Sequence, residues 1–305
     1  MSRHTRLSRF SPLSRFLPAN PSRLLTNPTV RRGAEAVLDV VRRGRYISWV
    51  PDGMDLGNLL TIGRWAYQGA EAGEDRFVLL RPHREAVLSM FPVLRQRLFV
   101  PLAQVRFTDR RLITWRGGWR PSDALYVNPD YIRTYLLPGS GLTHPPLDLS
   151  DTVVINVRRG MYYIRPDLRQ SFGFNVTEYV ATAVDATVHR SGLPRRFHVV
   201  SDDIPWCREH LPRVLPSKAE VSWGSGPDSR SDLATLAGAH RLILAISTFS
   251  YWGGFIGDEL HPGREVWVPW FLCRDLDGGD SARDIAPHWN VVRDIPGGWG
   301  PPPPD

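Results

Sequence analysis

Residues 151–166, DTVVINVRRGMYYIRP, join an apolar run directly to a pair of arginines. The run TVVINV at 152–157 lacks the polar alternation of a half-exposed strand, and this is typical of a parallel strand that is buried on both faces. Arg158 and Arg159 stay charged at physiological pH. We therefore expect the chain to leave the core at Arg158, so that the pair marks the carboxyl end of a strand.

The sequence that follows this strand alternates between short apolar strands and helices. Such alternation predicts a parallel sheet covered by helices on both faces. The expected strands are 152–157, 196–200, 219–223, 241–246 and 265–270, and the expected helices are 175–192, 204–211, 231–239 and 249–260. We therefore predict a Rossmann-like domain over residues 149–270.

The sequence before residue 149 is less regular. The expected elements are helices at 34–44, 58–73 and 84–99 and strands at 45–51 and 76–80, followed by a looser region. The Pro/Gly/Ser-rich stretch 136–150 is the predicted domain boundary. The chain is thereby divided into a basic, flexible tail at 1–33, an N-terminal α/β domain at 34–148, the Rossmann-like domain at 149–270, and a C-terminal segment at 271–305 with a disordered end.

The composition is that of a globular protein, with 305 residues of which 42% are hydrophobic. The net charge of +7 comes from arginine, because Lys218 is the only lysine, and we discount it as evidence for nucleic acid. Residues 1–34 carry seven arginines and no acid. A solvated tail, a transit peptide and a weak anchor to an anionic membrane surface all fit this segment. No later segment reaches the roughly 18 apolar residues of a membrane span.

We therefore expect a cytoplasmic protein, with peripheral membrane contact through the basic tail as the alternative. Cys207 and Cys273 are too few and too far apart for a disulfide framework or a zinc site. This cysteine usage favours a reducing compartment.

Polar side chains gather at the carboxyl ends of four predicted strands. Ligands of open parallel sheets bind outside these ends, so we expect the four groups to share one site. The groups are Arg158 and Arg159; Ser201, Asp202 and Asp203; Trp223 and Gly224; and Ser247, Thr248, Phe249 and Ser250.

The residue types in these groups suit an anionic nucleotide. Arginine offers a planar fork of donors to phosphate oxygens. The residues STFS at 247–250 open a helix, whose hydroxyls and free N–H groups form a phosphate cradle. Asp232 could accept a hydrogen bond from a base or a ribose hydroxyl, and Trp206 or Trp223 could stack on a base or sugar. Each group taken singly also fits a surface pair, a helix cap or a core residue; their convergence at one edge favours a site.

Several other chemistries are disfavoured. Asp202 and Asp203 do not form a convincing metal pair, because adjacent residues at a strand end point in different directions and no third carboxylate has ligand spacing nearby. No GxGxxG follows a strand and no GxxxxGK[ST] is present, which disfavours dinucleotide binding and ordinary NTPase activity.

Three segments of the chain resemble glycosyltransferase family 11, the α-1,2-fucosyltransferases. They are NVRRGMYY at 156–163, FHVVSDDIPWCREHL at 197–211 and SDLATLAGAHRLILAISTFSYWGGFIGD at 231–258. The first resembles the family's H-[VI]-R-R-G-D-Y, the second its SDD-x-x-WC, and the third its D-[LF]-x-L segment followed by a strand and S-[ST]-F-[SG]-x-W. A weaker match is LGNLLTIGRWAYQGA at 56–70, which resembles LGNQ-[LM]-FQYA.

The resemblance implies an α/β fold of the GT-B-like type, with two Rossmann-like domains facing across a cleft. It also implies an inverting fucosyltransferase that uses GDP-fucose, acts on a glycan hydroxyl to form an α-1,2 linkage, and needs no cofactor and no metal ion. Arg158 and Arg159 would hold the donor diphosphate and stabilise the charge of the leaving GDP. Asn58 would face the cleft from the acceptor side. The implied donor-binding residues are Asn156, Arg158, Arg159, Ser201, Asp202, Trp206, Asp232, Ser247, Thr248, Phe249 and Ser250.

Two departures from the family pattern concern the catalytic base. The family's His and Asp around the arginine pair are Asn156 and Met161 in this chain. Inversion asks for a group that takes the proton from the acceptor hydroxyl. Asp52, Asp55 and Asp167 are the candidates, and proton transfer to the departing phosphate is another route.

Two alternative functions stay open at this point, and a third is disfavoured. The chain could be a related transferase that uses another nucleotide sugar, or a degenerate, non-catalytic member that binds nucleotide or glycan. A nucleic-acid-binding module is disfavoured, because most arginines are scattered or lie in the tail. The expected partners are therefore a nucleotide sugar and a glycan acceptor.

Overall fold

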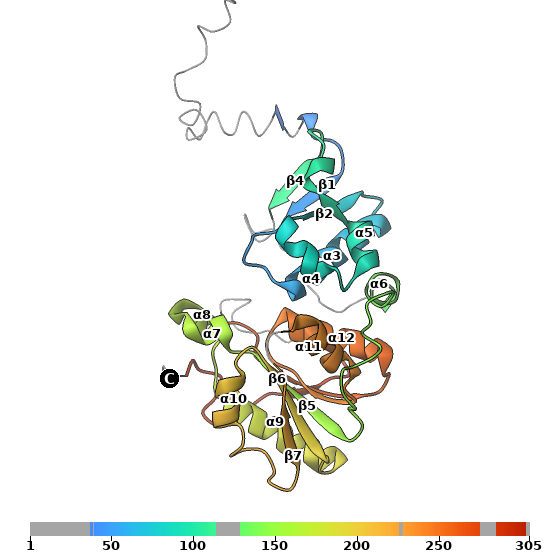
Figure 1. The fold of residues 1–305 in the computed structure, drawn as a ribbon. Helices are drawn as coiled ribbons and strands as arrows, with labels where there is room; N and C mark the ends of the chain where they lie inside the picture. Colours follow the sequence, from blue (N-terminus) through green and yellow to red (C-terminus); the bar gives the residue numbers. More distant parts are fainter. Residues whose placement is uncertain (1–36, 39, 114–128, 226–227, 275–284, 303–305) are drawn as a thin grey trace, which may run out of the picture.

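The computed structural model describes residues 37–38, 40–113, 129–225, 228–274 and 285–302. Within these ranges the chain forms two α/β domains stacked end to end (Figure 1). The tail predicted at 1–33 lies outside the described residues, as does part of the helix predicted at 34–44. Each domain is built on its own parallel sheet.

The N-terminal domain contains a sheet of four parallel strands in the order β3-β2-β1-β4. Helix α3 (Leu56–Glu71) connects β1 to β2. The strands are β1 (Tyr46–Trp49), β2 (Arg76–Leu80), β3 (Phe99–Pro101) and β4 (Arg110–Ile113). Strands β3 and β4 lie in the region that the sequence predicted to be loose, because β3 is only three residues long and β4 begins with two arginines.

The single helix predicted over 84–99 is wrong. Pro92 has no N–H to donate and its ring clashes with the preceding turn, so the helix breaks before it and a new one starts at it. The segment forms η2 (Pro82–Arg84), α4 (Glu85–Leu88) and α5 (Pro92–Leu98). After β3 the domain continues through η3 (Leu102–Gln104), α6 (Pro129–Tyr131) and the π-helix η4 (Ile132–Leu136).

The C-terminal domain contains six parallel strands in the order β10-β9-β8-β5-β6-β7. Counted from β5 and read from the β7 edge, this is the 3-2-1-4-5-6 order of the Rossmann fold, so the strand order reverses between β5 and β8. Strand β10 extends the sheet beyond residue 270, where the sequence ended the domain. The strands are β5 (Thr152–Val157), β6 (Arg196–Ser201), β7 (Glu220–Trp223), β8 (Arg241–Ile243), β9 (Glu265–Pro269) and β10 (Asn290–Val292).

Helices cover both faces of this second sheet. Val153 and Ile155 pack in the same apolar cluster as α9 (Val176–Ser191) and α10 (Ile204–His210). Val154 belongs to the cluster that contains α11 (Ser229–Gly238) and α12 (Thr248–Leu260). All six residues of β5 are buried, which accounts for its unbroken apolar sequence. Two short helices that the sequence did not predict follow β5, namely α7 (Gly160–Ile164) and α8 (Pro166–Phe172).

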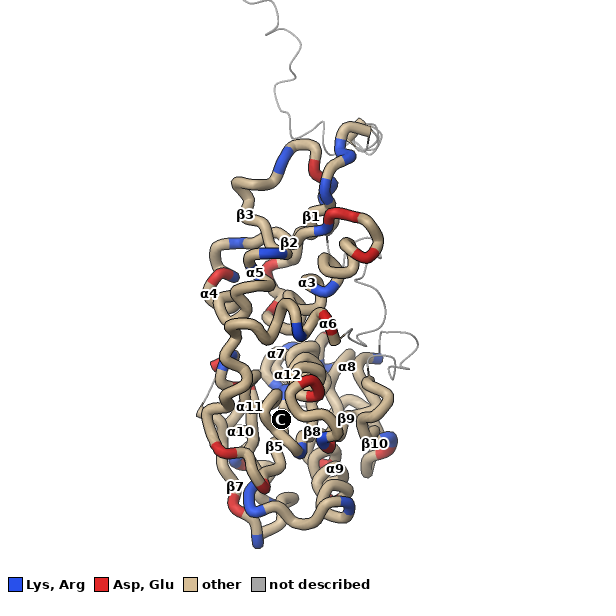
Figure 2. Tube along the Cα trace, turned by 90° about the vertical axis from the view of Figure 1, so that its right-hand side faces the viewer, with Lys and Arg blue, Asp and Glu red and all other residues tan. Residues whose placement is uncertain are grey.

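The two domains share one hydrophobic core through α3 and α12. Trp252 on α12 donates its indole N–H to the Thr61 hydroxyl on α3 at 3.1 Å. Tyr131 donates its hydroxyl to the Leu60 carbonyl at 2.9 Å and packs edge-on against Trp252, with ring centroids 5.6 Å apart. Figure 2 shows the same region from the side, with the backbone of α3 and α6 above that of α12. In the described ranges no helix is both long and apolar enough to cross a membrane.

Candidate active site

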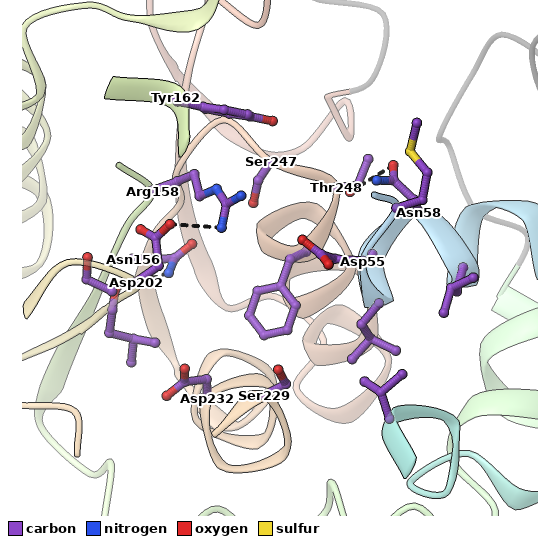
Figure 3. Close-up of a pocket in the computed structure, with 18 of the residues that line it drawn as sticks. Asp55, Asn58, Asn156, Arg158, Tyr162, Asp202, Ser229, Asp232, Ser247 and Thr248 are labelled. Carbon is purple, nitrogen blue, oxygen red and sulfur yellow. Dashed lines mark hydrogen bonds and ion pairs between the residues drawn. The ribbon is translucent and has the colours of Figure 1, made fainter. Parts of the chain in front are cut away.

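A pocket of about 450 Å³ lies between the two domains (Figure 3). Its N-terminal wall is formed by the segments that follow β1 and β2, and its C-terminal wall by those that follow β5, β6, β7 and β8. The first wall contains Asp52, Met54, Asp55, Leu56, Gly57, Asn58, Leu59, His83, Arg84 and Val87. The second contains Asn156, Val157, Arg158, Tyr162, Val200, Ser201, Asp202, Ser229, Asp232, Ser247, Thr248 and Phe249.

The pocket lies at the point where the strand order of the second sheet reverses. Asn156 and Arg158 come from the end of β5, and Ser247 follows β8, its neighbour in the sheet. Connections from these two strands run to opposite faces of the sheet, which opens a crevice at their carboxyl ends. The pocket therefore lies where open α/β sheets bind their ligands.

Three of the longer helices in the described ranges begin at the pocket. Helices α3, α11 and α12 each contribute residues of their first turn to its walls. Their N-termini present free backbone N–H groups and the positive ends of helix dipoles, which favour anions. Gly57 permits this convergence, because a Cβ at this position would lie 2.6 Å from the Thr248 carbonyl carbon.

Arg158 directs its guanidinium into the pocket. Its Nη1 is 2.8 Å from Asp202 Oδ2, and the side chain retains 30% of its exposure. The Nε of Arg158 is buried and has no hydrogen-bond partner in the part of the chain that the structure describes. Gly160 allows the turn that follows, since its φ is +24° and a Cβ there would collide with the Asp202 carboxylate. The partly exposed guanidinium is a suitable donor for an anionic ligand.

Arg159 does not line the pocket. Its side chain is 5% exposed, and its guanidinium lies 4.2 Å from the Tyr163 ring centroid and 3.9 Å from that of Trp206. Its backbone N–H donates to Asp202 at 2.8 Å, and its Nε is 3.5 Å from Asp203. The structure thus separates the two predicted phosphate ligands, with Arg158 at the pocket and Arg159 in a packed aromatic cluster.

A buried hydrogen-bond network fixes the wall between β5 and α12. The Asn156 side-chain N–H donates to the Val200 carbonyl at 3.1 Å, and its oxygen accepts from the Ser250 hydroxyl. Ser247 caps α12 by accepting from the Ser250 backbone N–H at 3.0 Å. Asn156 and Ser247 therefore reach the pocket, whereas Ser250 is fully buried beneath it.

The remaining predicted donor residues are divided between the pocket and its surroundings. Ser201, Thr248 and Phe249 line the pocket. Trp206 does not; it stacks on His210 with ring centroids 4.4 Å apart. Trp223 also lies outside the lining and packs in the core cluster around α9 and α10.

The predicted acidic residues occupy four different environments. Asp52 lines the pocket and pairs with Arg81 at 3.0 Å. Asp55 lines it without such a pairing, and Asp167 is outside it, paired with its neighbour Arg165. Asp232 lines the pocket from the first turn of α11, where burial and the nearby charge of Asp228 raise its pKa to about 7.

The predicted acceptor-side residue Asn58 joins the two walls. Its side-chain oxygen accepts from the Thr248 hydroxyl at 3.4 Å (Figure 3). The pocket also contains residues that the sequence did not assign, among them Tyr162, His83 and Arg84. Tyr162 stacks on Phe172 and lies under the Arg158 guanidinium. Arg84 donates to the Val50 and Pro51 carbonyls and so fixes the turn before Asp52.

A strand-end signal was present for all three of these residues. Tyr162 follows the arginine pair at the end of β5, and His83 and Arg84 lie in the polar run at 81–85 that follows β2. That the segment after β2 reaches the same pocket depends on how the two domains meet. Metal-ligating side chains do not gather at the site: no group of three or more His, Cys, Asp or Glu within the described ranges is arranged to hold a metal ion.

Two domains with parallel α/β sheets that face each other across a pocket define the GT-B class of glycosyltransferase fold, and the predicted fold class is confirmed. Residues 144–259 match the family model described as glycosyl transferase family 11. The predicted resemblance to this family is thereby confirmed over that segment.

Similar proteins include the alpha-1,2-colitosyltransferase of Escherichia coli, which is 25% identical over 132 residues, or 43% of this chain and 45% of that protein. The match therefore spans less than half of this curated relative. Similar solved structures include the iron-containing dodecameric glycosyltransferase TibC from enterotoxigenic E. coli H10407 (17% identity, TM-score 0.46, covering 83% of this chain and 64% of that one). Another is the E. coli heptosyltransferase WaaC with ADP-2-deoxy-2-fluoro heptose (12% identity, TM-score 0.44, covering 83% and 94%).

Proposed function

We propose that the protein is an inverting glycosyltransferase that transfers fucose from GDP-fucose to a hydroxyl of a glycan, forming an α-1,2 linkage. The observation that carries this proposal is the Arg158 guanidinium in an interdomain pocket at which helices α3, α11 and α12 begin. The match of residues 144–259 to family 11 supports the reaction class. Support for fucose is weaker and comes from the motifs around Arg158 and Ser247.

The donor diphosphate would lie against the C-terminal wall. Arg158 supplies a permanent positive charge, and the first turn of α12 adds the Ser247 and Thr248 hydroxyls and free N–H groups. Breaking the bond between sugar and phosphate places negative charge on the leaving GDP. A fixed guanidinium and fixed N–H groups stabilise that charge without having to reorganise. We therefore propose that transfer requires no metal ion.

The nucleoside would extend toward α11. Asp232 and Ser229 form that end of the C-terminal wall (Figure 3). A carboxylate there can accept from the N–H groups of a base or from a ribose hydroxyl. The acceptor glycan would enter from the N-terminal wall, where Asn58, Asp52 and His83 offer polar groups to sugar hydroxyls. Nucleic acid is not among the proposed partners, and in Figure 2 the basic residues are spread along both domains.

The test is donor turnover by the purified protein. GDP-fucose and, in parallel, other GDP-, ADP- and UDP-linked sugars are incubated with a panel of free mono- and disaccharides, and nucleotide release and product mass are measured. We expect turnover with GDP-fucose. Turnover with another donor alone would indicate a related transferase that uses a different nucleotide sugar. Tight GDP binding without any turnover would indicate a degenerate, non-catalytic member.

A nucleotide-activated colitose is the second donor to include in this panel. The specific reason is the curated relative, which is named an alpha-1,2-colitosyltransferase and is 25% identical to this chain over 132 residues. Preference for colitose over fucose, measured as a ratio of kcat/KM values, would replace fucose in the proposal and leave the roles of Arg158 and Ser247 unchanged.

A further inference from the structure

Asp55 occupies the N-cap position of α3 but does not cap the helix. Its backbone is extended, with φ of −87° and ψ of −176°, as an N-cap residue requires. An aspartate in this position normally accepts a hydrogen bond from a backbone N–H of the first turn. Among the N-cap residues of Asp, Asn or Ser type in the described helices, Asp55 alone makes no such bond. The others, which do, are Asn175, Asp203, Asp228 and Ser247.

The Asp55 carboxylate is directed into the pocket instead. It lines the pocket, and Figure 3 shows it projecting from the start of α3 into the space between the walls. It forms no hydrogen bond or ion pair with any residue in the described part of the chain. Its oxygens are therefore available to a ligand, which distinguishes Asp55 from the pocket carboxylates that are held by arginines.

The other pocket carboxylates are less suited to accept a proton from an acceptor. Asp202 is bound to Arg158 at 2.8 Å and lies on the wall proposed for the leaving group. Asp232 lies on that same wall, beside the proposed nucleoside position. Asp52 is on the opposite wall, but it pairs with Arg81 at 3.0 Å and lies 3.7 Å from His83.

The inversion proposed for this reaction determines on which wall of the pocket a catalytic base must lie. In an inverting displacement the acceptor oxygen attacks the anomeric carbon from the side opposite the leaving phosphate. A base must therefore face the phosphate site across the pocket. Asp55, on the N-terminal wall, faces the C-terminal wall that contains Arg158.

We propose, resting on the inverting transfer proposed above, that Asp55 is the catalytic base. As the acceptor oxygen bonds to the anomeric carbon, the bond from that carbon to the β-phosphate oxygen breaks, and its electron pair leaves with GDP. The acceptor proton passes to an Asp55 carboxylate oxygen and from there to water, since Asp55 is exposed. Asp55 thereby supplies the function of the acid that is replaced by Met161.

The experiment compares Asp55→Asn with Asp52→Asn. Asparagine keeps the shape of aspartate and is itself a good N-cap residue, so both variants should fold. With GDP-fucose and the saccharide that the wild type uses best, we expect Asp55→Asn to lower kcat by about 10²–10⁴-fold, the usual contribution of a positioned base. GDP affinity and the melting temperature should stay at wild-type values. Asp52→Asn should lower kcat less than Asp55→Asn does, and Asp167→Asn, at a carboxylate outside the pocket, is the control that should keep kcat within a few-fold of wild type.

The outcomes separate this inference from the proposed function. A wild-type protein that turns over GDP-fucose while Asp55→Asn retains kcat within tenfold overturns the role of Asp55 and leaves the transferase proposal intact. A large loss in Asp52→Asn with none in Asp55→Asn assigns the base to the Asp52–His83 pair and also overturns it. A wild-type protein that turns over no nucleotide sugar overturns the proposed function, and the role of Asp55 with it.

Discussion

The Arg159 guanidinium lies 3.9 Å from the centroid of the Trp206 ring, whereas the adjacent Arg158 lines the pocket. Two neighbouring arginines at one strand end therefore have different tasks. Arg159, also 4.2 Å from the Tyr163 centroid, joins the end of β5 to α7 and α10. Arg158 is left as the pocket guanidinium of this pair.

We expect Arg158→Ala to impair GDP binding and Arg159→Ala to lower the stability of the fold. Arg158→Ala should abolish GDP binding measurable by calorimetry, because it removes the guanidinium from the pocket, while the melting temperature changes little. Arg159→Ala should lower the free energy of unfolding by about 2 kcal/mol or more, since a desolvated cation between two rings is lost. Equal loss of GDP affinity at equal stability in both variants would contradict this division.

Gly57→Ala should disturb the contact between the two domains. A Cβ at Gly57 would lie 2.6 Å from the Thr248 carbonyl carbon and from its Oγ1, and helix backbone cannot move aside as a flexible side chain can. We expect a loss of about 1–3 kcal/mol in the free energy of unfolding, the usual effect of overpacking, together with weaker GDP binding.

Gly53→Ala provides the matched control for this substitution, because nothing lies within 4 Å of a Cβ at Gly53, in the loop just before α3. Urea denaturation of both variants tests the prediction. A Gly57→Ala protein as stable as Gly53→Ala would show that α3 and α12 can separate without loss.

Transfer should be insensitive to chelators. In the proposed mechanism Arg158 and the α12 N-terminus supply the positive charge at the leaving group. We expect kcat in EDTA to equal kcat in added Mg²⁺ or Mn²⁺. A rate that falls in EDTA and is restored by one of these ions would contradict the prediction. It would show that Arg158 and the α12 N-terminus do not stabilise the leaving group without a metal ion.

We expect Arg264 to contribute strongly to the free energy of unfolding. Its side chain is 1% exposed; it pairs with Asp258 at 3.0 Å and donates to carbonyls at the end of α11 and within α12. Removing one partner of a buried ion pair typically costs about 3–5 kcal/mol, and we expect that loss in Arg264→Ala. Arg213→Ala, at an exposed position, is the control. Urea unfolding that does not separate the two variants would contradict the prediction.

The sequence predicted most of the C-terminal sheet because its strands are buried on both faces. β5 is an unbroken apolar run, and its bounds were predicted to the residue. β4 and β10 were missed for the opposite reason. The first is an Arg-rich edge strand and the second has three residues, so neither carries a period-two or apolar pattern long enough to recognise.

From the residue pattern, the sequence predicted the part of the site that lies at the carboxyl ends of the C-terminal strands. The strand-end rule brought Arg158, Ser201 and Ser247 together from the sequence alone, and they share one wall. It could not decide between Arg158 and Arg159, because successive residues point to opposite sides and only the packing of Trp206 shows which side is core. His83 and Arg84 depend on the way one domain meets the other, which no local pattern encodes.

The stability of the protein should depend on pH through Asp232. Burial and the charge of Asp228 raise the Asp232 pKa to about 7 in the folded protein, against about 3.9 in an unfolded chain. Between these values the folded state holds a proton that the unfolded state has lost, so the free energy of unfolding falls as pH rises from about 4 to 7. Above pH 7 both states are ionised, and this loss is complete.

Asp232→Asn removes this dependence while keeping the size of the side chain. The variant and the wild type should therefore differ little in free energy of unfolding near pH 4, and the variant should become progressively more stable than the wild type up to pH 7, with a constant difference above it. Urea titrations at pH 4.5, 6, 7 and 8 measure the difference. In Asp228→Asn, which can still cap α11, the decline should end at a lower pH and be smaller, because the neighbouring charge that raises the Asp232 pKa is gone. A difference between Asp232→Asn and wild type that is independent of pH would show that Asp232 is ionised throughout this range.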